Sequence, residues 1–344
     1  MNRSFRLVWN AALGLWVVAS ELVKGKSKAK NHSSVCKLKS TFAKGLFSAG
    51  VGFISLPVVA IDLTWVGGEN GAWDELSSWD TGSLPTENDD VDINSGTAAI
   101  TSEAEANAID VGHDASSSGS LIITGIGSTL SANGEIVVGY EGEGSLEISD
   151  GARVEVGSDE KISIASELGS IGRVIVTGVG SALIGDEYLY VGMGGEGTLE
   201  VSDGATVEVD RLTILGSGSS LGSISSSSTV NIGAAEGETA VASGALLADY
   251  IEFDGAATSL IFNHTDTDYE LTADLNDAPG SGRVFLYAGT TSFTGDLTSF
   301  YGTMTVDGGT LYIAAGKTLE LRGNYMQTSA GVLKVGASSN SNYG

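Results

Sequence analysis

The chain has 344 residues, of which 49 are glycine and three are proline, and its formal net charge at pH 7 is −26. Glycine lies far above the roughly 7% of ordinary globular chains, which indicates frequent turns or closely stacked backbones. Residues 61–344 hold eight of the 17 basic residues but 42 of the 43 acids, a net charge of −34 that repels phosphate backbones and argues against a nucleic-acid partner.

Residues 1–60 predict a long export signal. Residues 24–44 are basic, residues 45–60 are apolar, and Ala60 precedes an expected cleavage site between Ala60 and Ile61. This order is the anatomy of a secretory signal, and about 15 apolar residues are short for a membrane-spanning helix. We expect a helical or disordered leader that uses the Sec translocon; a membrane anchor is the alternative.

The first 28 residues of the leader carry a further pattern. It consists of Asn2, Arg6, Val8, Trp9, Asn10, Trp16, Val17, Val18, Ser20 and Glu21. The segment resembles the extended signal peptide region of large autotransporters, the type V secreted proteins of Gram-negative bacteria. The resemblance implies export across the inner membrane, usually followed by passage through an outer-membrane β-barrel.

Residues 61–105 are expected to cap the N-terminal end of the body. They contain Trp65, Trp73 and Trp79, large side chains that can cover an open core at the first repeat. Together with Gly67, Gly68, Pro85, Asp90 and Val91, these tryptophans resemble the start of many autotransporter passengers.

Residues 106–240 repeat at an offset of 53. Residues 138–156 and 191–209 are identical at 14 of 19 positions, and residues 119–130 align in the same register with 172–183. Self-similarity at a fixed period predicts a solenoid or an array of stacked units.

Each unit consists of short strands. In residues 145–149, Leu146 and Ile148 alternate with Glu147 and Ser149, a two-residue period that directs aliphatic side chains inward and acids outward. Three strands per coil fit best, and each 53-residue unit is then two coils. The expected strands are 135–139, 145–149, 153–157, 161–165, 173–177, 182–184, 187–192, 198–202 and 206–210.

The predicted fold is therefore all-β, a right-handed parallel β-helix. A sandwich needs no sequence repeat, and propeller blades need longer strands with aromatic signatures that this chain lacks. Residues 241–344 are expected to continue the β-helix, because most of 254–344 resembles the late passenger region of adhesin-type autotransporters. Such proteins normally continue into a translocator barrel, which this sequence lacks, so we expect a truncated passenger.

Sequence motifs for catalysis are weak. Residues 218–222 match the GxSxG pattern, and Gly192, Gly194 and Gly197 match GxGxxG, but neither lies before a helix as those sites require. The only cysteine, Cys36, lies in the leader. We expect no catalytic residue, no cofactor and no metal-binding residue, and therefore no enzyme.

Two alternatives remain open, cation binding and a carbohydrate-active site. Loose cation binding by Asp89, Asp90 and Asp92, or by Asp150 and Asp203 in paired turns, competes with the interpretation that these are solvated turn acids. A carbohydrate-active β-helix would need several acids and a base that converge in one groove. His113 and His264 are expected in surface or turn positions.

The sequence thus predicts an exported passenger that acts at the cell surface or outer membrane if a barrel is supplied, and in the periplasm otherwise. Its expected work is adhesion to a host surface, or self-association in aggregation or biofilm, because flat faces rich in Ser, Thr and acids suit multivalent weak contacts. The alternatives are a carbohydrate-active enzyme and a nonfunctional truncated remnant.

Overall fold

The computed structural model describes residues 5–10, 15–20, 60–219, 227–277 and 280–337. The chain forms two compact units, Met1–Ile54 and Ser55–Gly344. In the first unit, β1 (Phe5–Asn10) and β2 (Leu15–Ser20) pair antiparallel. The expectation of a helical or disordered leader is therefore not confirmed, and the basic and apolar segments up to residue 59 lie outside the described residues.

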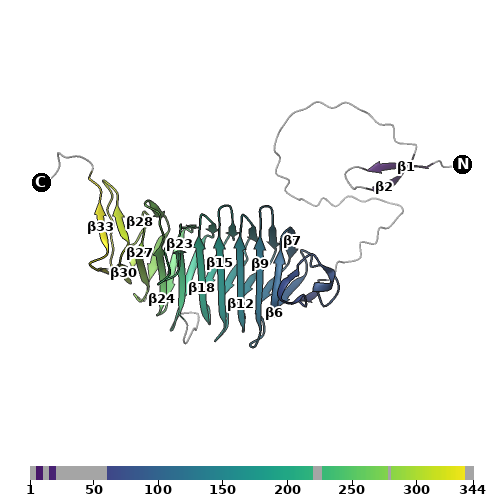
Figure 1. The fold of residues 1–344 in the computed structure, drawn as a ribbon, viewed down its shortest axis with the longest axis horizontal. Coiled ribbons are helices and arrows are strands. Elements are labelled where there is room, and N and C mark those ends of the chain that lie inside the picture. Colours follow the sequence, from purple (N-terminus) through teal and green to yellow (C-terminus); the bar gives the residue numbers. More distant parts are fainter. Residues whose placement is uncertain (1–4, 11–14, 21–59, 220–226, 278–279, 338–344) are drawn as a thin grey trace, which may run out of the picture. The chain divides into compact units, whose positions relative to one another are not determined.

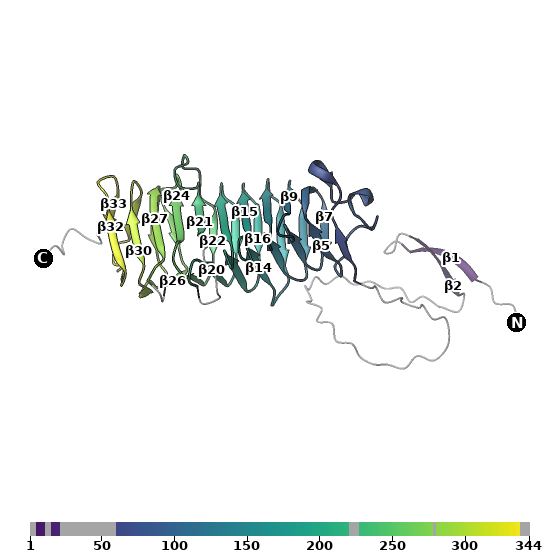
Figure 2. The ribbon, with the colours of Figure 1, turned by 90° about the horizontal axis from the view of Figure 1, so that it is seen from below.

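The second unit is a parallel β-solenoid of about 11 turns, which agrees with the predicted class. Each turn contributes strands to different sheets, so that neighbours within a sheet, such as β9, β12 and β15, come from successive turns (Figures 1 and 2). The right-handed sense of winding and the boundaries of the predicted cap, repeat and late regions stay predictions. No helix among the described residues is both long and apolar enough to cross a bilayer.

Four sheets surround the core of the second unit. The ten-stranded sheet contains β3 (Asp62–Thr64), β5 (Asp90–Ile93), β8 (Ile109–Val111), β11 (Ile136–Val138), β14 (Lys161–Ile164), β17 (Tyr188–Val191), β20 (Arg211–Leu215), β23 (Tyr250–Asp254), β26 (Asp274–Asp277) and β29 (Ser299–Phe300). The eleven-stranded sheet contains β4 (Gly71–Ala72), β6 (Ser95–Ile100), β9 (Ser118–Thr124), β12 (Glu143–Ser149), β15 (Ile171–Thr177), β18 (Glu196–Ser202), β21 (Ser228–Gly233), β24 (Thr258–Asn263), β27 (Arg283–Ala288), β30 (Thr303–Val306) and β32 (Asn324–Gln327).

The remaining strands form two shorter sheets. The first contains β7 (Glu103–Ala106), β10 (Thr129–Ala132), β13 (Arg153–Val156), β16 (Ala182–Ile184), β19 (Thr206–Glu208) and β22 (Ala245–Leu247). The second contains β25 (Tyr269–Leu271), β28 (Thr290–Phe293), β31 (Thr310–Ile313) and β33 (Val332–Val335). Two short 3-10 helices, η1 (Gly68–Asn70) and η2 (Leu76–Ser78), lie in the first turn.

The strand register explains the 53-residue period. Leu146 in β12 pairs with Val174 in β15, and Val174 pairs with Leu199 in β18. Each repeat unit therefore spans two turns, as predicted. The aliphatic residues of these strands point inward, since Leu146, Ile148, Leu199 and Val201 are all buried. Burial of one such side chain contributes about 1.5–3 kcal/mol, so stacked aliphatic rows hold the turns together.

A row of glycines crosses the N-terminal ends of neighbouring strands in the eleven-stranded sheet. Gly119, Gly144, Gly172 and Gly197 occupy matching positions on β9, β12, β15 and β18. A Cβ atom on Gly144 would lie 2.3 Å from both the amide nitrogen of Gly139 and the carbonyl oxygen of Val111. The chain turns too tightly there for any side chain, which accounts for part of the glycine excess.

Three tryptophans form a buried cluster in the first turn. Trp79 packs edge-on against Trp65 and Trp73, with ring centroids 5.2 and 4.8 Å away. The Nε1–H of Trp79 donates a hydrogen bond to the carbonyl oxygen of Trp73 at 2.9 Å. The large rings supply apolar area in this first turn, and the role of residues 61–105 as a cap stays a prediction.

Candidate functional site

Two carboxylates stand side by side on the outer surface of the ten-stranded sheet. Asp92 in β5 and Asp110 in β8 are direct partners in the parallel register. Each lies between two buried aliphatic residues, Val91 and Ile93 around Asp92 and Ile109 and Val111 around Asp110. The two-residue period of a strand therefore directs both carboxylates away from the core and toward the same side.

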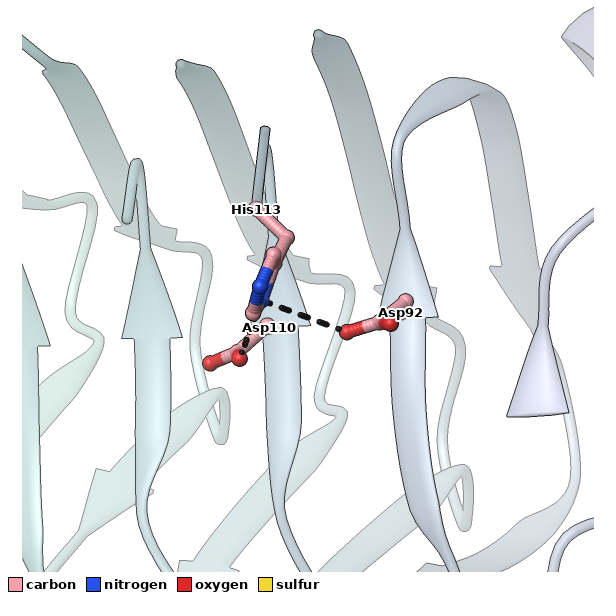
Figure 3. A group of neighbouring side chains, drawn as sticks. All are labelled: Asp92, Asp110 and His113. Atoms are coloured by element: carbon pink, nitrogen blue, oxygen red, sulfur yellow. Dashed lines mark hydrogen bonds and ion pairs between the residues drawn. The ribbon is translucent and has the colours of Figure 1, made fainter. Parts of the chain in front are cut away.

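His113 follows β8 and leans back over these carboxylates (Figure 3). Its backbone N–H donates to Asn94 Oδ1 at 2.9 Å, which anchors it to the preceding turn. Its ring stacks on Tyr140 of the following turn, with centroids 4.9 Å apart and planes 27° from parallel. Contacts on both sides thus orient the imidazole.

The Nδ1 atom of His113 faces both acids. It lies 2.8 Å from Asp110 Oδ2 and 3.5 Å from Asp92 Oδ1. One ligand atom from each of the three residues lies within 4.8 Å of the others, and all three side chains are half-buried. We call Asp92, Asp110 and His113 the Asp–His cluster.

The local charge is strongly negative. Burial raises the pKa of Asp92, His113 opposes the rise, and Asp110, Asp62 and Asp114 reinforce it. Burial likewise raises the pKa of Asp110 against its hydrogen bond with His113.

The negative charge of the cluster also changes the pKa of the His113 imidazole. Partial burial disfavours protonation of His113, but the hydrogen bond to Asp110 and the charges of Asp92, Asp110 and Asp114 outweigh burial and raise its pKa. The cluster therefore favours a positive charge at its centre, from a protonated imidazole or from a bound cation.

The other predicted cation positions accept hydrogen bonds from neighbouring protein groups. Asp89 is buried and accepts hydrogen bonds from Thr86, and Asp90 accepts from Asn107 Nδ2 at 2.7 Å. Asp150 and Asp203 lie exposed in turns, where Asp150 accepts from Thr124 Oγ1 at 3.2 Å. Among the suggested acids, only Asp92 joins the Asp–His cluster.

Asp110 and His113 were not predicted as partners of Asp92. A signal exists, since an aliphatic–Asp–aliphatic triplet occurs at residues 91–93 and again at 109–111. The two triplets could have been aligned as outward positions of neighbouring turns. Their spacing of 18 residues is shorter than half of the 53-residue repeat, so the repeat alone does not bring them together.

The expectation of a surface or turn position for His264 is wrong. His264 is fully buried and forms an isolated bridge with Val241. Its Nδ1 accepts the N–H of Asp266 at 3.2 Å, so the proton lies on Nε2, which donates to Thr291 Oγ1 at 3.0 Å. Both ring nitrogens of this buried histidine therefore have hydrogen-bond partners.

The two glycine motifs fall in different places. Gly192 and Gly194 lie in the turn between β17 and β18, and Gly197 lies in β18, so a strand rather than a helix follows the motif. In the GxSxG match, residues 220–222 lie outside the described part of the chain, and the described Ser219 is buried.

The expected cleavage position adjoins a buried carboxylate. Ala60 and Ile61 are exposed, directly before β3. The N–H of Ile61 donates to Asp89 Oδ1 at 3.0 Å. Burial alone would raise the pKa of Asp89, but the donors from Thr86 and Ile61 outweigh it and lower the pKa.

A cavity of about 490 Å³ lies over the outer side of the four-stranded sheet. Asp268, Glu270, Lys317 and Lys334 line it together with Tyr312. All four charged side chains are exposed, and Lys334 Nζ lies 5.0 Å from the ring centre of Tyr312.

Comparisons with known proteins identify the leader. Residues 1–50 match the family model of the extended signal peptide of the type V secretion system. The chain thus carries the extended signal peptide typical of type V autotransporters, followed by a parallel β-solenoid that fits an autotransporter passenger.

The chain is also similar to a curated protein. Over 171 residues the chain is 33% identical to the uncharacterized lipoprotein YdeK of Escherichia coli (strain K12), a match that covers 48% of this chain and 12% of that protein. The chain therefore spans a small part of that relative's length. No solved structure matches this chain.

Proposed function

We propose that this chain is an exported passenger that works at the cell envelope through adhesion or self-association, without catalysis. The observation that carries the proposal is the succession of a type V extended signal peptide and a parallel β-solenoid in one chain. Export across the inner membrane follows from the leader. The similarity to a protein named a lipoprotein supports an envelope location.

A repeated apolar feature suggests how the solenoid makes contacts. Ile126 is 96% exposed and Val179 is 84% exposed. Ile126 follows β9 and Val179 follows β15, which are equivalent strands two turns apart in the eleven-stranded sheet. Each lies against a glycine of the next turn, Gly151 for Ile126 and Gly204 for Val179. Regularly spaced apolar tips on a soluble solenoid suit weak multivalent binding, including binding to a second copy.

Localisation is tested by expressing the chain in a Gram-negative host, alone and with a translocator barrel fused to its C-terminus. We expect the solenoid in the periplasm in the first case and accessible to external protease in the second. A version without residues 1–50 serves as the control for the extended signal peptide. Retention of the intact chain in the cytoplasm in both cases would contradict the proposal.

Contact function is tested in a settling assay on cells that display the solenoid. We expect the double variant Ile126→Ser, Val179→Ser to reduce settling, whereas Leu168→Ser, at an exposed aliphatic residue elsewhere, leaves it unchanged. Equal settling of the unmodified strain and both variants would mean that Ile126 and Val179 do not contribute to the contact between cells. Absence of settling and of surface binding in the unmodified strain would contradict adhesion and self-association together.

One observation favours a second candidate function, a carbohydrate-active enzyme. Asp268, Glu270, Lys317 and Lys334 line the cavity over the four-stranded sheet, the kind of grouping that polysaccharide cleavage needs. Both acids are exposed, however, whereas a general acid at neutral pH normally relies on burial to raise its pKa. Polysaccharide cleavage by the purified chain that is lost in Glu270→Gln would establish this alternative over the first.

A further inference from the structure

We propose that the Asp–His cluster of Asp92, Asp110 and His113 binds a divalent transition-metal ion of the zinc class. The inference is independent of the adhesive function, since it rests on the geometry of this part of the ten-stranded sheet.

The first argument is the placement of the ligand atoms. Around a tetrahedral zinc ion with ligands at about 2.0–2.1 Å, neighbouring ligand atoms are about 3.4 Å apart. His113 Nδ1 lies 3.5 Å from Asp92 Oδ1 and 2.8 Å from Asp110 Oδ2, and all three ligand atoms lie within 4.8 Å. Small side-chain rotations would bring the three atoms around one ion and leave a fourth position for water.

The second argument is charge. Like charges directly opposite each other on neighbouring strands are destabilising, and Asp92 and Asp110 are such a pair. Elsewhere in the same outward row, the strands that follow carry Val137, Ser163 and Tyr190. Asp62, Asp90, Asp114 and Glu135 add negative charge around the pair. A divalent cation would neutralise the negative charge of both carboxylates, which a single protonated imidazole neutralises only in part.

The third argument is preorganisation. Asn94 holds the backbone of His113, and Tyr140 stacks on its ring, so the imidazole is oriented by groups outside the cluster. The carboxylates are fixed by the strand register. A site whose ligands are already oriented loses less conformational entropy when the ion binds.

The donor set selects the class of ion. One imidazole nitrogen and two carboxylate oxygens suit zinc and its neighbours in the first transition row, whereas calcium takes six to eight oxygen ligands and magnesium keeps most of its waters. The expected order of affinity is therefore zinc well above calcium and magnesium.

The test is calorimetric titration of the exported, purified chain with ZnCl₂, CaCl₂ and MgCl₂. We expect one saturable zinc site and no comparable binding of the other two ions. Changes to outer-shell groups alone weaken metal sites by about 10–100-fold, so His113→Ala and Asp110→Asn should each weaken zinc binding by about 100-fold or more. Glu105→Gln, at an exposed acid of β7 in a different sheet, is the matched control and should retain the affinity.

Imidazole NMR spectra provide a second readout that does not depend on stability. Of the three histidines, His32 lies in the leader and His264 is buried in the core, so zinc should shift only the His113 signals of the exported chain. Thermal unfolding of each variant without metal verifies that it is folded. Zinc binding that is unchanged in folded His113→Ala and Asp110→Asn, or no saturable zinc binding in the unmodified chain, would overturn the proposal.

Discussion

At the scale of single residues, the solenoid depends on positions where no side chain fits. Gly144 belongs to the row of glycines that crosses the N-terminal ends of strands in the eleven-stranded sheet, where a Cβ atom would lie 2.3 Å from backbone atoms of two neighbouring segments. Its constraint is steric, because its backbone is not in the left-handed region. Backbone atoms of a stacked turn cannot move independently, so the clash cannot be relieved locally.

We expect Gly144→Ala to lower the free energy of unfolding by about 1–3 kcal/mol, the usual cost of overpacking. Urea unfolding followed by circular dichroism measures the change. Gly185→Ala is the control, because its added Cβ would meet first the end of the Ile162 side chain, at 3.3 Å. Equal stability of Gly144→Ala and the unmodified chain would contradict the steric explanation.

The residue Asp89 ties the predicted cleavage site to the first turn. Cleavage between Ala60 and Ile61 would turn the amide that donates to Asp89 Oδ1 into an α-ammonium group, a charge-assisted donor to a buried carboxylate. N-terminal sequencing of the exported chain should therefore begin at Ile61. Any other first residue would contradict the predicted position.

In a chain that begins at Ile61, Asp89→Asn should lower the free energy of unfolding by about 1.5–3 kcal/mol, the range for hydrogen bonds to charged groups. Thermal and urea unfolding of the exported chain measure it. Asp80→Asn is the control, since Asp80 is exposed and accepts the N–H of Thr64 at 3.0 Å. A similar small loss in both variants would mean that the charge of Asp89 has no special role.

At the scale of elements, neighbouring strands are joined by inward polar contacts as well as by aliphatic rows. His264, at the end of β24, bonds to Thr291 of β28 in the next turn while its ring packs against Tyr269 of β25, with centroids 5.2 Å apart. Burial lowers the pKa of His264, and Asp266 opposes the effect. The packing of these three strands therefore requires a neutral imidazole.

The sign of the resulting pH dependence follows from proton linkage. In the unfolded chain His264 binds a proton near pH 6.5, whereas in the folded chain it does so only at lower pH. The neutral imidazole therefore contributes fully to the free energy of unfolding above about pH 6.5, and this contribution is lost as the pH falls below that value. We expect His264→Gln to be less sensitive than the unmodified chain to acidification from pH 7.5 to 5.5. Urea unfolding at both pH values measures the difference, and an unchanged difference would contradict a neutral buried His264.

At the scale of the whole molecule, charge and apolar tips oppose each other. Residues 61–344 carry a net charge of −34, which keeps copies of the chain apart, while Ile126 and Val179 offer apolar contacts between copies. Salt screens the repulsion, because the Debye length falls from about 30 Å at 0.01 M to about 8 Å at 0.15 M. Apolar contacts are not screened.

Self-association should therefore strengthen when the NaCl concentration rises from about 0.01 M to about 0.15 M. Sedimentation velocity of the exported chain measures the change, and the double variant Ile126→Ser, Val179→Ser should remain monomeric at both concentrations. Association that weakens with added salt would instead indicate contacts between opposite charges.

Local sequence determined most of the architecture. The strict alternation around Leu146 and Leu199 and the 53-residue period predicted the coil strands closely, because each turn repeats the same inward and outward pattern over short sequence distances. The extended signal peptide was also readable, since its pattern is contiguous in the chain.

Only the tertiary structure decided which outward side chains meet. Asp92 and Asp110 become neighbours through the register of β5 and β8, and His113 joins them because Asn94 and Tyr140 on adjacent turns orient it. The burial of His264 likewise depends on strands that follow it in later turns. Residue patterns encode which face a side chain takes, whereas contacts between turns depend on the length of each coil, which varies along this solenoid.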